Sequence, residues 1–311
     1  MTQRIVSLIS SATEIVCGLG FGQQLVGRSH ECDFPASITA LPVCSTSKVA
    51  IEAAGRAIDD QVRAIVADGL SVYRVDPDLL DRLAPTVIVT QTQCEVCAVS
   101  LKDVEDAVCR LVGSRPRIVS LEPMALGDIW RDIRTVASAL GDPARGDALV
   151  TRLTDRLTAV RAAAGAEPSR PSLACIEWID PLMSAANWVP ELVDCAGGAN
   201  LFGAAGQHSG YLRMEQLVAA DPDVIAVMPC GFDIERAGRE MAPLVAHPDW
   251  PRLSAVRSGR VVMMDGNQYF NRPGPRVVES AEILAECLHP GRCDFGHQGH
   301  GWRYWRGAAP S

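Results

Sequence analysis

A long helical stretch in the middle of the chain restricts how the whole chain can fold. From Leu126 to about Ala164, apolar residues recur at helical spacing, and the only interruption is Gly141-Asp142-Pro143. This pattern predicts two long helices in series, followed by a Pro/Ser-rich segment at 168–172. On both sides, short β-branched segments alternate with amphipathic helical segments. The sequence therefore predicts an α/β protein in which two Rossmann-like lobes are joined by a long, rigid helical connector.

The expected elements divide the chain into four parts. Buried strands are expected in both halves, at 4–8, 86–90, 118–121, 172–177, 223–227 and 260–264. Residues 233–246 are expected to be mostly helical. The parts are an N-terminal α/β lobe at 1–125, the connector at 126–168, a C-terminal α/β lobe at 169–290 and a tail at 291–311.

A local similarity between the two halves supports two related lobes. In each half, a carboxylate stands seven residues before a proline that leads into a buried strand. The carboxylates are Asp78, before Pro85, and Glu215, before Pro222. A strand–helix unit that is used twice indicates similar lobes. The alternative is chance, because helix–proline–strand turns are common in α/β proteins.

Charge and composition exclude several classes of partner. The chain has 29 basic and 37 acidic residues and a formal net charge of −8, which disfavours nucleic acid as a partner. The apolar segment Ile5–Ile9 is shorter than an export signal of roughly 7–15 apolar residues. No run approaches the roughly 18 apolar residues of a membrane span. The 11 cysteines are an odd number in a long chain. These features predict a cytoplasmic protein in a reducing compartment, without a membrane span.

Three segments carry a family resemblance. The first joins Arg4-Ile-Val-Ser-Leu8 to Ser11-Ala-Thr-Glu14, and the second joins Glu191-Leu-Val193 to Gly197-Gly-Ala-Asn200. The third is Tyr269-Phe-Asn-Arg-Pro-Gly-Pro-Arg276. With these segments, the chain to about residue 289 resembles the substrate-binding proteins of corrinoid (cobalamin) and iron-chelate uptake. That family is periplasmic-binding-protein-like and has a helical backbone between its lobes.

The resemblance implies a ligand cleft between two lobes and a link to ABC transporters. In this family each lobe presents an acidic residue to a membrane permease, and by position these are Asp78 and Glu215. Tyr269 falls on the family's aromatic wall. The first-lobe wall, often aromatic in corrinoid binders, is polar here at 90–97. Without a visible export signal the chain is similar to a cytosolic branch, in which permease docking would lose its purpose.

Loops beyond the carboxyl ends of strands are the usual ligand sites of such folds, and they support a first hypothesis. This hypothesis is a non-catalytic protein that binds a corrinoid or a similar flat metal chelate. Trp178, Trp188 and Tyr269 would stack on the ligand. The alternative for the tryptophans is core packing, and for Arg272 it is pairing with helix-end carbonyls. Polar contacts would come from Glu31, Gln91, Glu122, Glu177, Asp180 and Arg272.

A second hypothesis is a metalloprotein, or an enzyme, on the same fold. Cys94 and Cys97 have the spacing of a dithiol or a two-thiolate chelate, and His30 with Cys32 would complete a tetrahedral site for zinc, iron or an iron–sulfur cluster. The alternative is that the two thiols are uncharged and cap a turn. No dinucleotide fingerprint, P-loop or nucleophile elbow is present, which favours binding over catalysis.

Two further possibilities concern the tail of the chain and a protein that no longer binds a ligand. Cys293, His297 and His300 in the tail suggest either metal capture or a tail that folds its aromatic residues back onto the body. A third hypothesis is a cytosolic scaffold that has lost its ligand. It predicts binding of neither a metal nor a metal chelate.

Overall fold

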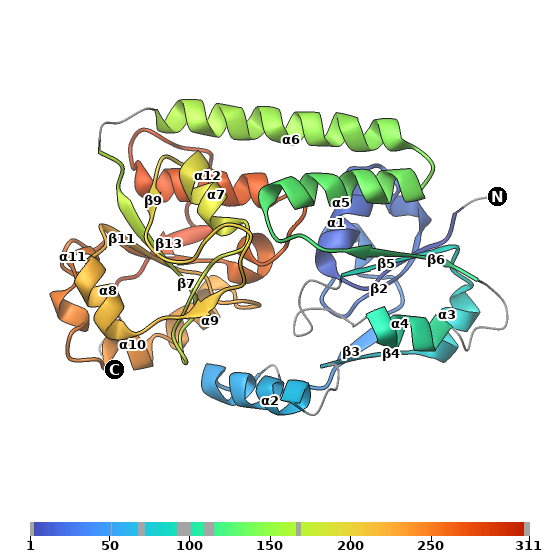
Figure 1. Cartoon of the computed structure of the whole chain (residues 1–311), viewed down its shortest axis with the longest axis horizontal. Helices are drawn as coiled ribbons and strands as arrows, with labels where there is room; N and C mark the ends of the chain where they lie inside the picture. The colour runs from blue at the N-terminus through green and yellow to red at the C-terminus, as the bar shows by residue number, and fades with distance from the viewer. Residues whose placement is uncertain are drawn as a thin grey trace. The chain divides into compact units, whose positions relative to one another are not determined.

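The chain forms two compact α/β units in the computed structural model (Figure 1). The structure describes residues 3–50, 52–67, 72–91, 101–108, 115–165 and 169–307. Unit 1 comprises Met1–Pro123 and Gly127–Arg152, and unit 2 comprises Met124–Leu126 and Leu153–Ser311. Each unit has its own sheet, as the sequence predicts.

Unit 1 is built on a parallel sheet of four strands in the order β2-β1-β5-β6. All five residues of β5 are buried, which explains its almost continuous apolar and β-branched sequence. A separate two-stranded sheet pairs β3 with β4 in antiparallel fashion. The strands are β1 (Ile5–Ser7), β2 (Leu25–Arg28), β3 (Ser45–Ser47), β4 (Tyr73–Val75), β5 (Val87–Gln91) and β6 (Arg117–Leu121). The helices are α1 (Ser10–Gly18), η1 (Gly22–Gln24), η2 (Ala36–Ile38), α2 (Gly55–Ala67), α3 (Pro77–Leu83) and α4 (Leu101–Val108).

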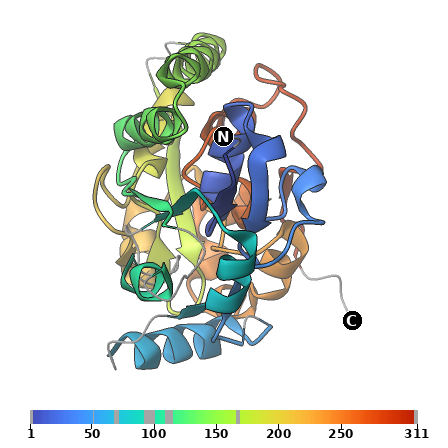
Figure 2. The same cartoon turned by 90° about the vertical axis from the view of Figure 1, so that its right-hand side faces the viewer.

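The two long helices predicted in the middle of the chain are present as α5 (Leu126–Ala139) and α6 (Pro143–Ala164). Gly141, at φ +83°, ends the first of them, and a proline begins the second. The first turns of α6 pack closely on α5 (Figure 2), since a Cβ at Gly146 would lie 2.7 Å from the Cβ of Ala137. Among the described helices, none combines the length and the apolar character needed to cross a membrane.

Unit 2 is built on a mixed sheet whose central strands β7, β11 and β12 are parallel. Antiparallel strands extend both sides, in the order β10-β8-β7-β11-β12-β13, and β9 also pairs with β7. The strands are β7 (Ser172–Trp178), β8 (Met183–Ser184), β9 (Ala199–Asn200), β10 (Gly210–Tyr211), β11 (Val224–Val227), β12 (Val261–Met264) and β13 (Trp302–Tyr304). The helices are α7 (Val189–Cys195), α8 (Met214–Ala220), α9 (Ile234–Arg239), α10 (Ala242–Val245), η3 (Trp250–Arg252), α11 (Ser254–Arg257), η4 (Gly266–Phe270) and α12 (Val277–Leu288).

Helix α12 is the central helix of unit 2 and packs beside α7 (Figure 1). It is buried almost all round, and two of its buried residues are carboxylates. Glu286 accepts hydrogen bonds from the backbone of Phe295 and His297 and from Trp302 Nε1, at 2.6, 3.0 and 2.6 Å. Glu282 contacts His297 Nε2 at 2.8 Å. These bonds fasten the tail, whose strand β13 pairs with β12.

Two details differ from the sequence-based expectation. The helix expected at 233–246 is divided into α9 and α10, because Gly238 weakens the first helix and Pro243 suits the first turn of a new one. The expected tail does not merely cover the body with its aromatic residues, because part of it is a strand of the unit 2 sheet.

Candidate functional site

The carboxyl ends of the unit 1 strands bring four of the predicted site residues to one end of the sheet. Ser7 pairs with both Arg28 and Val89, and Gln91 pairs with Leu121, so the parallel strands end together. The loops that follow carry the predicted residues at this end of the sheet. We call them the unit 1 strand-end group, which consists of His30, Glu31, Gln91 and Glu122.

His30 lies in a network of polar side chains. Its Nδ1 is 2.9 Å from Ser45 Oγ, which in turn donates to Ser29 Oγ at 3.1 Å. The ring of Tyr73 lies 5.2 Å from the ring of His30, and its hydroxyl donates to Glu31 Oε1 at 2.8 Å. Burial, aided by the nearby charge of Arg28, lowers the pKa of His30. The ring is therefore neutral at pH 7.

Gln91 and Glu122 occupy different environments at the same end of the sheet. Gln91 is buried, and its Oε1 accepts a hydrogen bond from Ser11 at 3.4 Å. Glu122 is exposed, and its backbone N–H donates to Asp132 of α5. Burial is the main reason why the pKa of Asp132 rises to about 7. No pattern in the sequence indicated that Asp132 is buried, because a lone acid on a helix is usually exposed.

The proposed metal ligands are only partly described. Cys94 and Cys97 lie outside the described residues. Cys32 is fully buried, and its Sγ accepts a hydrogen bond from Thr13 Oγ1 at 3.0 Å. No group of three His, Cys, Asp or Glu side chains that could hold a metal ion occurs among the residues that the structure describes. The four-ligand site stays a prediction.

The carboxyl ends of the unit 2 strands gather aromatic and acidic side chains. The rings of Trp178 and Phe232 lie 5.1 Å apart at a tilt of 50°. The guanidinium carbon of Arg236 lies 3.9 Å from the centre of the Phe232 ring, within cation–π distance. Trp178 Nε1 donates to the backbone oxygen of Asp180 at 3.1 Å, which fixes the indole orientation. We call Glu177, Trp178, Asp180 and Phe232 the unit 2 strand-end group.

Glu177 is the half-buried acid of this group. Its Oε2 accepts a hydrogen bond from Ser209 Oγ at 2.6 Å, and Ser209 in turn accepts from the backbone N–H of Ala186 at 3.1 Å. Burial raises the pKa of Glu177, and the bond from Ser209 only partly opposes this effect. The carboxyl group is held in place by a second residue, as expected of a side chain that orients a ligand.

The loop after β12 holds Tyr269 and Arg272. Tyr269 is only 8% exposed, with the guanidinium carbon of Arg276 5.3 Å from its ring centre. Arg272 is buried, and its Nη2 donates to Asn267 Oδ1 at 3.1 Å. Both side chains are therefore packed inside the protein and are not exposed on the surface of this loop.

Trp188 is buried, whereas the two predicted docking acids are exposed. Trp188 is 5% exposed at the start of α7, and its Nε1 has no hydrogen-bond partner among the described residues. This environment is that of a core tryptophan. Asp78 and Glu215 are exposed in the first turns of α3 and α8.

Several side chains of these groups were missed in the sequence. Ligands usually bind beyond the carboxyl ends of strands, and we call this the strand-end rule. Phe232 follows β11, so this rule was sufficient to find it, as it was for Trp178. Tyr73 lies on β4 and Ser45 on β3, and the pairing of these two distant strands brings both residues next to His30. No local pattern predicts such a contact.

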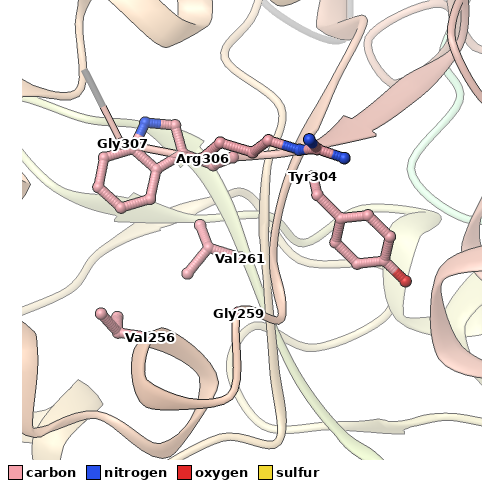
Figure 3. Close-up of a pocket in the computed structure, with 7 residues that line it drawn as sticks. Val256, Gly259, Val261, Tyr304, Arg306 and Gly307 are labelled. Carbon is pink, nitrogen blue, oxygen red and sulfur yellow. The ribbon is translucent and has the colours of Figure 1, made fainter. Parts of the chain in front are cut away.

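A shallow groove lies elsewhere in unit 2, beside β12 and β13 (Figure 3). None of the predicted site residues lines it. Its lining consists of Val256, Gly259, Val261, Tyr304, Trp305, Arg306 and Gly307.

Comparisons with known proteins agree on one family. Residues 5–267 match the family described as periplasmic binding protein. An uncharacterized ABC transporter substrate-binding lipoprotein of Bacillus subtilis (strain 168) is 21% identical over 295 residues, which cover 93% of this chain and 80% of the relative. A cobalamin-binding protein of Halobacterium salinarum (strain R1) is 25% identical over 92% of this chain and 69% of the relative.

Solved structures share the fold. The apo periplasmic heme-binding protein of Roseiflexus sp. RS-1 has a TM-score of 0.68 at 22% identity, over 93% of this chain and 98% of that chain. The periplasmic vitamin B12-binding protein of Vibrio cholerae has a TM-score of 0.63 at 21% identity, over 92% of this chain and 96% of that chain. The α/β fold and the family match together confirm the resemblance seen in the sequence, and the chain belongs to the periplasmic binding protein family.

Proposed function

We propose that this chain binds a flat metal chelate of the corrinoid or heme class and does not transform it. The observation that carries the proposal is the unit 2 strand-end group, in which Trp178 and Glu177 are neighbours at the end of β7 and both are half-buried. An aromatic face with a few fixed polar groups is the usual composition of a site for a large, flat ligand.

The relatives support the class of ligand. One is named as a cobalamin-binding protein and another as a vitamin B12-binding protein, and four of the similar structures are named as heme-binding proteins. These ligands share a flat ring system around a metal ion and a polar periphery. Trp178 would contact the ring, and Glu177 and Asp180 would accept or donate hydrogen bonds at its periphery.

Unit 1 has its own strand-end group of polar side chains. Glu31 is held by the hydroxyl of Tyr73, and Gln91 by Ser11, so both have defined orientations. The expectation that the two lobes close on one ligand stays a prediction. The metalloprotein hypothesis gains no support from the names of the relatives, and we do not propose it.

We also propose that the protein acts in the cytoplasm. Its eight described cysteines are free thiols, and burial raises the pKa of several, including Cys44 and Cys175. Such thiols suit a reducing compartment. There Asp78 and Glu215 would have no permease to contact. Recovery of the protein from a membrane or periplasmic fraction would favour docking to an ABC permease instead.

A titration of the purified protein tests the proposed function. Hemin and aquacobalamin are added separately, and binding is followed by tryptophan fluorescence and visible absorption. We expect at least one of them to bind with a dissociation constant in the micromolar range or below. Trp178→Ala should weaken binding at least tenfold, which corresponds to about 1.4 kcal/mol. Trp178→Phe, which keeps an aromatic face, should stay within about threefold.

Two results would contradict the proposal. One is the failure of both probes to bind at 100 μM (~5.5 kcal/mol of binding free energy) to folded protein. The other is binding that is unchanged in Trp178→Ala. Tyr211→Ala is the matched control, because Tyr211 is 60% exposed on the short strand β10 and lies outside the strand-end group.

A further inference from the structure

One face of α12 carries three carboxylates in the interior of unit 2. They are Glu279, Glu282 and Glu286, whose spacing places them on the same side of the helix. Glu282 and Glu286 are buried, and Glu279 is half-buried. Arg156, in the part of α6 that belongs to unit 2, donates from Nη2 to both oxygens of Glu282, at 2.8 and 3.0 Å. Buried carboxylates are costly unless cations and N–H donors face them in this way.

His297 of the tail faces these carboxylates. Its Nε2 lies 2.8 Å from Glu282 Oε2, and the two side chains are only 11% and 10% exposed. Nδ1 is buried and has no hydrogen-bond partner among the described residues. The rings of Tyr269 and His300 lie 6.2 and 5.6 Å from the ring of His297. Within the described part of the chain, the ring is therefore held by its bond with Glu282 and by ring contacts.

The surroundings of His297 favour its protonated form. Burial alone would lower the pKa of His297, but the bond with Glu282 and the negative charges of the three carboxylates raise it. Burial acts to raise the pKa of Glu282, but its bonds with His297 and Arg156 lower it. Burial raises the pKa of Glu279, and the charges of Arg276 and His297 act against this effect. The shifts of His297 and Glu282 agree on an ion pair, in which the hydrogen bond is stronger than one between neutral groups.

The position of His297 in the chain connects this pair to the outer strand of the sheet. His297 lies a few residues before Trp302, at which β13 begins, and β13 is the edge strand next to β12. After β13, the tail also provides part of the lining of the groove in Figure 3. Opening of the tail would therefore uncover the edge of β12 and remove one side of this groove.

We propose that the pair of His297 and Glu282 is a pH-sensitive latch that holds the tail on α12. Protonated His297 fastens the tail, and transfer of its proton to solvent weakens the pair, so that the tail opens more often. The three bonds to Glu286 remain, and the tail therefore loosens without unfolding of unit 2. The latch does not depend on the proposed function.

The direction of the pH dependence follows from linkage. The pKa of His297 is raised above its ordinary value of 6.5 while the tail is closed, and it returns toward that value when the tail opens. A group of this kind stabilises the closed tail fully below pH 6.5, and this contribution is lost as the pH rises through the raised pKa. The tail is therefore held most firmly in mild acid and most weakly in alkaline solution.

Hydrogen exchange of backbone amides in the whole protein, measured from pH 6 to pH 9, tests the latch. Protection factors are compared, because they remove the pH dependence of the exchange chemistry itself. The tail is reported by the amides of β13 and by that of Trp305, which donates to Val261 O at 2.9 Å. Strand β11, inside the same sheet, reports unfolding of the whole unit. We expect protection of the tail amides to fall at least about fivefold more than that of β11.

Two variants assign the effect to the pair. His297→Gln keeps a donor for Glu282 but cannot be protonated, so its tail amides should be protected as weakly at pH 6 as at pH 9. Glu282→Gln keeps an acceptor and removes the charge, and it should reduce the fall of the tail amides relative to β11 by at least about half. It also tests the latch if His297→Gln does not fold. His300→Gln, at an exposed histidine of the same segment, is the matched control and should behave like the unsubstituted protein.

Three results would overturn the latch. The first is tail protection that does not fall with pH in the unsubstituted protein. The second is an equal fall in β11 and in the tail, since the pH would then act on the whole of unit 2. The third is a fall confined to the tail that persists unchanged in His297→Gln or, if that variant does not fold, in Glu282→Gln.

Discussion

At the scale of single residues, the candidate site contains polar side chains whose neighbours hold them in place. Glu177 is fixed by Ser209, and His30 by Ser45, in both cases through a hydrogen bond shorter than 3 Å. Each partner is remote in the sequence, at a separation of 32 and 15 residues respectively. Side chains that are oriented in advance lose less entropy when a ligand binds, which increases affinity.

Asp132 gives a prediction about stability. Its carboxyl group is 5% exposed, and Oδ2 has no hydrogen-bond partner within the described part of the chain. Burial raises its pKa to about 7 from 3.8, so the protonated form is favoured in the folded state. The contribution of the protonated Asp132 to the free energy of unfolding is therefore retained at low pH and lost as the pH rises from about 4 to above 7. Asp132→Asn should stabilise the protein at pH 8 by up to about 4 kcal/mol and have little effect near pH 4.

Thermal and urea unfolding at pH 4.5, 6 and 8 would measure this effect. The difference in unfolding free energy between Asp132→Asn and the unsubstituted protein should grow with pH. Asp78→Asn, at an exposed acid of the same unit, is the control. A constant difference at all three pH values would show that Asp132 does not titrate in this range.

At the scale of elements, the repeated unit seen in the sequence has one form in both halves. Helices α3 and α8 each have seven residues and end at a residue in the left-handed conformation, Ala84 at φ 43° and Asp221 at φ 39°. A proline and a central parallel strand then follow in each unit, β5 in unit 1 and β11 in unit 2. The sequence similarity was therefore structural and not chance.

The tail gives a second prediction at this scale. Glu286 accepts three hydrogen bonds from the segment that leads into β13. Glu286→Ala would leave three donors without this acceptor and should destabilise unit 2 by about 2–4 kcal/mol. Glu215→Ala, at a side chain that is 77% exposed, should change stability by less than about 0.5 kcal/mol.

Urea unfolding followed by tryptophan fluorescence would compare the two variants, since Trp302 and Trp305 belong to the tail. Limited proteolysis should also release the tail earlier in Glu286→Ala than in Glu215→Ala. Equal stabilities and equal cleavage rates would show that the tail is held by its strand pairing and aromatic contacts alone.

At the scale of the whole molecule, the periodicity of the sequence was enough to predict the fold class. The buried strands at 86–90 and 118–121 were each expected within one residue of the observed ends of β5 and β6. The break at 141–143 was also correct, because glycine and proline have strong local preferences. Local patterns could not predict that β13 joins the sheet, since this depends on acceptors of α12 at a distance in the sequence.

The candidate site was predictable only in part. The strand-end rule correctly indicated His30, Glu31, Gln91 and Trp178 as residues at the carboxyl ends of strands. It did not indicate which of them are fixed, because their partners come from other strands and loops. Trp188 satisfied the composition of a site, but it is buried at the start of α7.

The proposed function depends on binding of a metal chelate at the unit 2 strand-end group. Native mass spectrometry with a visible absorption spectrum tests it most directly, on protein purified without oxygen and then supplied with hemin and aquacobalamin. We expect a one-to-one complex whose added mass is that of a complete tetrapyrrole, with matching visible bands. The opposite result is a protein that carries bare zinc, iron or an iron–sulfur cluster and takes up neither probe. In that case Cys94→Ser should remove the metal, and the proposed function is wrong.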